Sequence, residues 1–324
     1  MELEEVFDLV RDDLQKVESE LSKNVLSHIS LIPNIGKYVL SSGGKRFRPL
    51  VLILSAKFCG YTGSYHIPLA SIFEFIHTAS LLHDDVVDNA EVRRGNSSVN
   101  SVWGNEASVL IGDYLFSKSF SLLSNIGDLK IFKVLSDATT RLAEGEIMEL
   151  EKSGDPSTTE EDYISIVTEK TAVLISAACQ VGAILGDAPK EQEKALKGFG
   201  LNLGISFQLV DDILDYISTE EEFGKTIGKD LYEGRTTLPL IHTLNVCDHS
   251  DREKIINIIR SNNYRNRDLS TIIDLIKRYK GVDYTFKLAE SYAETAKEYL
   301  KEFNFSIEKQ ALLATADYAI KRKR

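Results

Sequence analysis

Cysteine and proline are both scarce in this sequence of 324 residues. The three cysteines, Cys59, Cys179 and Cys247, lie far apart, and an odd number at such spacing fits neither a disulfide framework nor a zinc site. We expect them to be small apolar residues in a reducing compartment, the cytoplasm. The six prolines leave long stretches between them, which suits helices because proline breaks a helix interior.

Basic residues are outnumbered, and this argues against nucleic acid as a main partner. The chain has 38 Lys and Arg against 49 Asp and Glu, a formal net charge of −11, so a phosphate backbone would be repelled. A small anionic ligand can still bind, because metal ions and a few local cations can reverse the sign of the charge within one cleft.

The sequence also lacks a long apolar run. The longest uncharged stretch lies between Lys170 and Asp187 and contains Ser176 and Gln180, which is short for a membrane span of about 20 residues. We therefore expect a buried helix there and no transmembrane segment. The first residues, MELEEVFDLVRDDLQ, are acidic and amphipathic, unlike a signal peptide.

Strand-like alternation and fixed-period repeats are missing as well, whereas helical periodicity is extensive. Helices are predicted over 68–89, 128–151, 160–185, 190–217, 252–260, 268–280, 284–303 and 306–321. Two segments, 31–45 and 218–237, carry several glycines and are expected to be non-helical. The predicted fold class is all-α, a single helical bundle in one domain over residues 1–324.

Two acidic clusters share one spacing, Asp-Asp-x-x-Asp, and each follows an apolar helical run. Residues four apart lie on one helix face, so Asp84 points with Asp88, and Asp211 with Asp215. Negative charge concentrated beside apolar residues needs a compensating cation. Carboxylate oxygens suit Mg²⁺, which prefers one or two carboxylates together with substrate phosphates. Two such pairs facing each other would hold a metal–diphosphate cluster.

Cationic residues accompany these clusters. They include Lys45 and Arg48 after two glycines, Arg93 and Arg94 after the first cluster, and Lys170 and Lys225 elsewhere. Guanidinium groups match diphosphate oxygens, and lysines add point charge. The combination suggests two anionic substrates, one bound through metal and one held by cations.

At these residues the sequence resembles the all-trans polyprenyl diphosphate synthase family, of medium or long product length. The stretches that carry the resemblance are GGKRFRP (43–49), EFIHTASLLHDDVVDNAEVRRG (74–95), EGEIMEL (144–150), EKT (169–171), FQLVDDILD (207–215) and GKTIGKDLYEGRTTLP (224–239). The resemblance covers nearly the whole chain. It implies a bundle of the isoprenoid synthase type with a central cavity.

The resemblance also implies a role for each matching residue. Metal would be held by Asp84, Asp88 and Asp211, with Asp85, Asp212 and Asp215 as neighbouring carboxylates. The allylic diphosphate would contact Arg93, Lys170, Lys225 and Lys229. Isopentenyl diphosphate would be held by Lys45, Arg48, His77 and Arg94. Thr171 and Gln208 would line the reaction centre, and Glu149 is left outside the metal shell.

The chemistry implied is elongation of an allylic diphosphate by isopentenyl diphosphate, with two or three Mg²⁺ ions. The allylic primer would be dimethylallyl, geranyl, farnesyl or geranylgeranyl diphosphate, and the enzyme a cytoplasmic homodimer. Metal and cations stabilise the departing pyrophosphate, and the isopentenyl double bond attacks the resulting carbocation. The loop at 218–237 would close over the site.

Product length should be set by the helix before Asp84. Ser80, Ile76 and Phe73 lie on the same side as Asp84 at depths of roughly 6, 12 and 16 Å, and the resemblance adds Ala79. Because Ala79 and Ser80 are small, the tunnel mouth is expected to be open. Phe73 is the candidate floor and Phe132 a weaker one, which predicts a hexaprenyl to octaprenyl product, with geranylgeranyl as the alternative.

Other classes fit the sequence less well. A terpene cyclase would not need the cations at 45–48, and its second metal motif differs from Asp211–Asp215. An HD-type phosphohydrolase leaves the second acidic cluster unexplained. A di-iron bundle needs two Glu-x-x-His motifs, and 74–77 is the only one. A non-catalytic partner subunit would usually lose its acidic motifs. The basic residues 321–324 are either a frayed tail or a cap on the isopentenyl diphosphate site.

Overall fold

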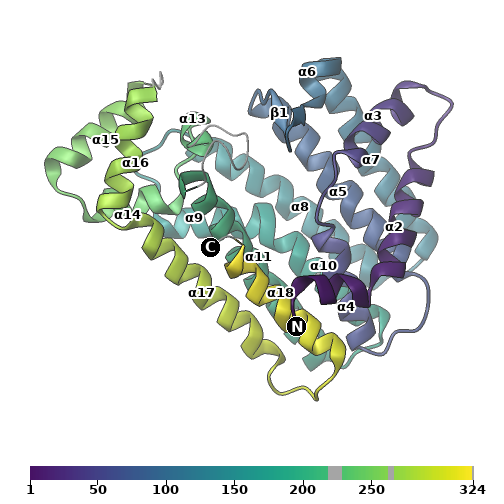
Figure 1. Cartoon of the computed structure of the whole chain (residues 1–324). Coiled ribbons are helices and arrows are strands. Elements are labelled where there is room, and N and C mark those ends of the chain that lie inside the picture. The colour runs from purple at the N-terminus through teal and green to yellow at the C-terminus, as the bar shows by residue number, and fades with distance from the viewer. Residues whose placement is uncertain (218–227, 262–265, 323–324) are drawn as a thin grey trace. The chain divides into compact units, whose positions relative to one another are not determined.

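The computed structural model describes residues 1–217, 228–261 and 266–322, and helices dominate it (Figure 1). The all-α prediction is thereby confirmed. The chain divides into two compact units. Unit 1 comprises residues 1–139, 174–197 and 302–315, and unit 2 comprises residues 140–173, 198–301 and 316–324. Three of the five boundaries fall inside α8 (Leu129–Lys152), α11 (Lys190–Ile217) and α18 (Ile307–Lys321); the others lie at the start of α10 (Val173–Leu185) and just after α17 (Gly281–Leu300). The single domain over residues 1–324 stays a prediction.

Unit 1 is built around α5, which packs against α2, α4 and α7; α5 and α7 run side by side in Figure 1. In chain order, the elements of this unit are α1 (Leu3–Leu9), α2 (Arg11–Asn24), α3 (Leu31–Ser41), α4 (Phe47–Phe58), α5 (His66–Val87), β1 (Val92–Arg93), β2 (Asn96–Ser97), α6 (Val99–Trp103), α7 (Asn105–Ile126) and nearly all of α10 (Val173–Leu185).

The central helix α5 is apolar over most of its length, and this explains its position. Leu69, Phe73 and Ile76 are completely or almost completely buried, so leaving water is the main gain when this helix packs. A glycine lets α7 approach closely. A Cβ atom at Gly112 would lie 2.3 Å from Nε2 of His83 on α5. The predicted helix at 68–89 is therefore confirmed.

The expectation of a non-helical segment at 31–45 is wrong for its first part, because residues 31–41 form α3. Pro33 lies in the first turn, where backbone N–H groups have no helical partner, so proline breaks nothing. Gly36 faces Val25, and a Cβ there would lie 2.9 Å from the Val25 Cβ. The glycine serves close packing and does not end the helix.

Unit 2 contains two apolar clusters. Its elements are α9 (Glu160–Val167), the π-helical turn η1 (Thr168–Ala172), α13 (Lys229–Tyr232), α14 (Leu238–Val246), α15 (His249–Ser261), α16 (Asn266–Arg278) and α17 (Gly281–Leu300), with parts of α8, α11 and α18. One cluster joins α9, α11, α14 and α17 through residues such as Tyr163, Leu209 and Leu238. The other joins α14, α15 and α16 through Leu244, Ile255 and Ile272.

The stretch from Glu160 to Leu185 is long and apolar enough to cross a membrane by length and composition, and in the described part of the chain it is the one helix with this property. Of its most apolar 18 residues, 61% are buried, as in a core helix.

The three cysteines are free, with Cys179 buried and the other two half-buried. Burial raises the pKa of the Cys59 and Cys179 thiols to about 12.

Candidate functional site

The first acidic cluster lies at the carboxyl end of α5 in unit 1. Asp84 and Asp85 lie in its last turn, and Asp88 is the C-cap residue. Asp85 is 3% exposed and accepts a hydrogen bond of 2.8 Å from Arg93 Nε. Asp84 and Asp88 are half-buried. The middle aspartate is therefore paired with an arginine, and the outer two are the carboxylates that solvent reaches.

A small hairpin that the sequence analysis missed carries both arginines of the first cluster. β1 and β2 are antiparallel, and the turn residues Arg94 and Gly95 have φ values of 52° and 78°. Two left-handed residues are what a type I′ turn requires, and the glycine at 95 was the available signal. Tyr38 holds the hairpin by donating to the Ser97 carbonyl at 2.7 Å. Arg94 donates to the Gly43 carbonyl.

His77 shares a pocket in unit 1 with Arg46, Arg93 and Arg94. Burial, followed by the charge of Arg48 and then of the other arginines, lowers the pKa of His77 well below its usual range. The ring is therefore neutral at pH 7 and can offer an N–H to an anion. Of the four residues predicted to hold isopentenyl diphosphate, the structure gathers Arg48, His77 and Arg94. Lys45 lies exposed on the loop just before Arg46.

Arg46 was not predicted, yet it organises this pocket. Its guanidinium pairs with Glu18 of α2 and, at 3.0 Å, with Glu74 of α5. Its backbone is left-handed, with φ of 46°. Each pairing spans 28 residues, and no local sequence rule connects partners at that distance. Arg46 holds the junction between the loop that carries Lys45 and the first turn of α4, which carries Arg48.

The residues predicted to set product length are mostly buried on α5. Phe73 and Ala79 have no accessible surface, Ile76 has 1%, and Ser80 has 7%. No water-wide channel therefore passes Ala79, and the expectation of an open mouth at that residue is not met. Ser80 donates to the His77 carbonyl at 2.9 Å. Phe132 is 38% exposed, near Phe120, so Phe73 is the better candidate for a floor.

The second acidic cluster lies near the end of α11 in unit 2, and its three aspartates have different surroundings. Asp212 is 5% exposed. Asp215 accepts from the backbone N–H groups of Lys229 and Asp230 at 3.2 and 3.0 Å, which fixes the start of α13. Asp211 has 42% of its side chain exposed, and its Oδ1 lies 2.7 Å from Arg322. The expectation of a frayed tail is therefore wrong for Arg322.

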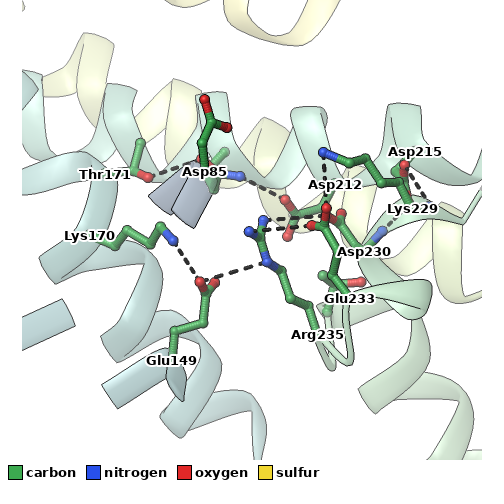
Figure 2. Close-up of polar contacts among 12 residues, drawn as sticks. Asp85, Glu149, Lys170, Thr171, Asp212, Asp215, Lys229, Asp230, Glu233 and Arg235 are labelled. Atoms are coloured by element: carbon green, nitrogen blue, oxygen red, sulfur yellow. Dashed lines mark hydrogen bonds and ion pairs between the residues drawn. The ribbon is translucent and has the colours of Figure 1, made fainter. Parts of the chain in front are cut away.

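Lys170 lies at the centre of an ion-pair group in unit 2. Its amine is 2.6 Å from carboxylate oxygens of both Glu146 and Glu149 on α8. Arg235 lies 3.8 Å from Glu149 on its other side, and Figure 2 shows both cations directed at this carboxylate. Burial raises the pKa of Glu149, but the charges of Lys170 and Arg235 outweigh it and lower the pKa. The Glu149 carboxylate therefore forms ion pairs with both cations. Its place outside the metal shell stays a prediction.

Backbone geometry places Lys170 at this point. Thr168–Ala172 form a π-helical turn, a feature that often accompanies functional sites. A Cβ atom at Gly145 of α8 would lie 2.5 Å from the Lys170 backbone nitrogen. The glycine therefore allows α8 and η1 to touch through their backbones.

Thr171, Gln208 and Asp212 form a hydrogen-bonded series, and they line one pocket with Lys170. Thr171 Oγ1 donates to Gln208 Oε1 at 3.0 Å, and Gln208 Nε2 donates to Asp212 Oδ1 at 2.8 Å. The hydroxyl of Tyr163, which was not predicted, donates to the other oxygen of Asp212. Gln208 is thereby fixed in one orientation.

The donor set fits a hard divalent cation. Burial, with the charges of Asp211 and Glu149, raises the pKa of Asp212 to about 7, although Tyr163 and Gln208 act to lower it. Such crowding of carboxylates is relieved by a bound cation. Among the described residues no three His, Cys, Asp or Glu side chains could hold a metal by themselves. Carboxylate oxygens suit Mg²⁺, whose remaining ligands are usually phosphates and water.

Of the two remaining lysines predicted to contact the diphosphate, the structure describes only Lys229. Lys225 lies outside the described residues, as does the first half of the loop expected to close over the site, 218–227. Lys229 is described, and its amine is 3.0 Å from Glu233. Asp230 beside it is nearly buried; burial first, then Asp212 and Asp215, raises its pKa well above the usual range.

Each unit thus carries an aspartate cluster near the end of an apolar helix, with cations beside it. These are the groups with which an enzyme binds diphosphate substrates. A family model named Polyprenyl synthetase matches residues 29–276. The chain belongs to that family, as the resemblance implied, and it is a trans-prenyltransferase.

Relatives agree over the full length. The chain is 38% identical to octaprenyl diphosphate synthase of Escherichia coli over 100% of both chains. It is 34% identical to heptaprenyl diphosphate synthase component 2 of Bacillus subtilis, covering 100% of this chain and 92% of that one. A solved polyprenyl synthase from Caulobacter crescentus, complexed with calcium and isoprenyl diphosphate, superposes with a TM-score of 0.96 at 35% identity, covering 99% and 98%.

Proposed function

We propose that this all-trans polyprenyl diphosphate synthase of medium chain length binds its allylic diphosphate through Mg²⁺ held by Asp84, Asp88 and Asp211. The supporting observation is the division within each cluster. Asp85 and Asp212 are buried and held by protein donors, whereas Asp84, Asp88 and Asp211 are only half-buried, so that solvent still reaches them. When bound, Mg²⁺ would supply positive charge to the departing pyrophosphate.

The cations of unit 2 act on the same diphosphate in this proposal. Lys170 and Lys229 would contact its oxygens, together with Lys225 and with Arg93 of unit 1. Thr171 and Gln208 would face the allylic carbon, where the uncharged oxygen dipoles of a fixed amide and hydroxyl stabilise positive charge without capturing it. The hydrogen bond from Gln208 Nε2 to Asp212 leaves the amide oxygen directed toward Thr171.

The second substrate, isopentenyl diphosphate, would occupy the arginine-lined pocket of unit 1. Arg48 and Arg94 would bind its phosphates, Lys45 would add charge from the loop, and neutral His77 would donate a hydrogen bond. A neutral ring suits this place because the arginines already supply positive charge. Holding the double bond close to the allylic carbon makes the carbon–carbon step effectively intramolecular.

We also propose a cytoplasmic homodimer with a hexaprenyl to octaprenyl product. Apolar side chains on α6 and α7 support a dimer, because Val102, Val109 and Leu110 are 49%, 38% and 65% exposed. The octaprenyl and heptaprenyl synthases among the relatives support the product range. Light scattering on the purified protein would measure the mass, and a monomer would contradict the dimer.

One assay tests the proposed activity. The protein is incubated with Mg²⁺, labelled isopentenyl diphosphate and each allylic primer, and the dephosphorylated products are sized by chromatography. Linear products of six to eight isoprene units are expected. A cyclic hydrocarbon made from the allylic substrate alone would indicate a terpene cyclase, and no incorporation with any primer would indicate a non-catalytic subunit. A C20 product would support the geranylgeranyl alternative.

A further inference from the structure

Arg322 directly follows α18, and its side chain is docked within unit 2. The side chain is 6% exposed. Nη1 donates to Asp211 Oδ1 at 2.7 Å, and Nη2 donates to the Phe207 carbonyl at 2.7 Å. The guanidinium carbon lies 3.4 Å from the centre of the Phe207 ring. One arginine therefore uses its two terminal nitrogens and its flat face on a single turn of α11.

The two residues that Arg322 contacts on α11 lie on one face of that helix. Phe207 and Asp211 are four residues apart on α11, so they lie on the same helix face. The Asp211 side chain is 42% exposed, and a partly exposed carboxylate can turn about its side-chain bonds at little cost. A donor fixed at Oδ1 removes that freedom, while the second oxygen, Oδ2, is the one left for a metal ion.

We infer that Arg322 is a positioning residue for metal binding: it holds Asp211 by one oxygen so that the other can bind Mg²⁺. Carboxylates that bind metals are commonly held in this way by a second group. This inference rests on the proposed role of Asp211.

The alternative is that Arg322 competes with the metal for Asp211. The remaining contacts argue against this. The guanidinium is anchored by the Phe207 carbonyl and ring independently of Asp211. Losing Asp211 would leave a buried cation without its counter-charge, which is costly. An arginine built in this way is suited to remain in place when the metal binds.

The test measures metal binding directly, with Mn²⁺ as a spectroscopic substitute for Mg²⁺ and inorganic pyrophosphate as the anion. Titration followed by electron paramagnetic resonance gives the Mn²⁺ affinity without turnover. Arg322→Ala is expected to weaken it about tenfold or more. Arg322→Lys should recover only part of the loss, because one ammonium cannot reproduce the planar fork. Lys321→Ala is the matched control, since it removes the same charge from an exposed neighbour, and its affinity should stay within about twofold.

The outcomes separate the inference from the proposed function. Unchanged Mn²⁺ affinity in Arg322→Ala would overturn the inference, and tighter binding would overturn it in favour of competition. Asp211→Asn reports on the proposed function: if it binds Mn²⁺ as the wild type does, Asp211 is not a ligand and both ideas fail. If only Asp211→Asn loses metal, the proposed function stands and the role of Arg322 does not. Circular dichroism of each variant checks folding, and Arg322→Lys retains the test if Arg322→Ala unfolds.

Discussion

At the scale of single residues, each acidic cluster uses chemically identical side chains for different tasks. Asp85 pairs with Arg93, Asp212 accepts from Tyr163 and Gln208, and Asp215 binds two backbone N–H groups. The environment of each carboxylate decides its task, because hydrogen-bond donors around a carboxylate hold it in one orientation.

The accessible aspartates should therefore be the ones on which turnover depends. We predict that Asp84→Ala or Asp211→Ala lowers kcat by several orders of magnitude. Both side chains are partly exposed, so the circular dichroism spectrum should stay helical, although Asp211→Ala should lower the melting temperature because Arg322 loses its counter-charge. Asp12→Ala, on the exposed face of α2, is the control and should keep full activity. Full activity in excess EDTA would contradict the metal dependence.

The two diphosphates should depend on different cations. We predict that Arg48→Ala raises KM mainly for isopentenyl diphosphate, and that Lys170→Ala raises KM mainly for the allylic substrate. A lost charge-assisted contact costs about 1.5–3 kcal/mol, which is roughly a 10- to 150-fold change in KM. Initial rates with each substrate varied in turn would measure this. Equal effects of both variants on both substrates would refute the assignment.

At the scale of elements, the contact between α8 and η1 depends on the absence of a side chain. We predict that Gly145→Ala destabilises the protein by about 1–3 kcal/mol, because its Cβ would come within 2.5 Å of the Lys170 backbone nitrogen. The shift of Lys170 should also reduce activity. Denaturant unfolding and rates would be compared with Glu144→Ala, an exposed neighbour on α8. A Gly145→Ala protein as stable as this control would show that the backbones can separate freely.

The length of the product should be set by residues on α5. We predict that Ser80→Phe and Ala79→Phe shorten the product to about the farnesyl or geranylgeranyl level, and that Phe73→Ala lengthens it. Since Ala79 has no accessible surface, a phenyl ring there should also overpack the core and lower the melting temperature more than at Ser80. Chromatography of the dephosphorylated products would decide. Unchanged lengths in all three variants would mean that the tail runs along another path.

Elements with strong local signals were predictable from the sequence, and those that depend on distant neighbours were not. The helix at 190–217 has the predicted bounds because its apolar period is unbroken. α3 was missed because its glycine was taken as a breaker, whereas it faces Val25. The acidic spacing in the sequence located both aspartate clusters at helix ends, and their role in metal binding stays a prediction. Pairings such as Arg46 with Glu74 or Arg322 with Asp211 join residues 28 and 111 positions apart, and only the fold brings them together.

At the scale of the whole molecule, stability should respond to the buried histidine. Burial and the neighbouring arginines lower the pKa of His77 from its usual 6.5. The unfolded chain therefore binds a proton more readily, so stability is fully present above about pH 6.5 and is lost as the pH falls below it. We predict a decline in the free energy of unfolding of at most about 1.4 kcal/mol per pH unit from this group.

The measurement is denaturant unfolding at several pH values between 7.5 and 5 in wild type and His77→Gln. The variant should show a weaker pH dependence over this range, because the group that resists protonation has been removed. The same slope in both proteins would mean that His77 titrates normally in the folded state.

Two arginines in unit 1, Arg46 and Arg94, keep a left-handed backbone with φ of 46° and 52°. Any residue with a Cβ pays about 1–2 kcal/mol there, and glycine does not. A design procedure that ranks substitutions by backbone conformation alone would therefore select both positions for glycine. It would dismantle the cationic pocket, and at Arg46 it would also leave the buried Glu74 without its cation. Thermostable versions of this synthase should be sought elsewhere in the chain, with these two strained arginines kept as they are.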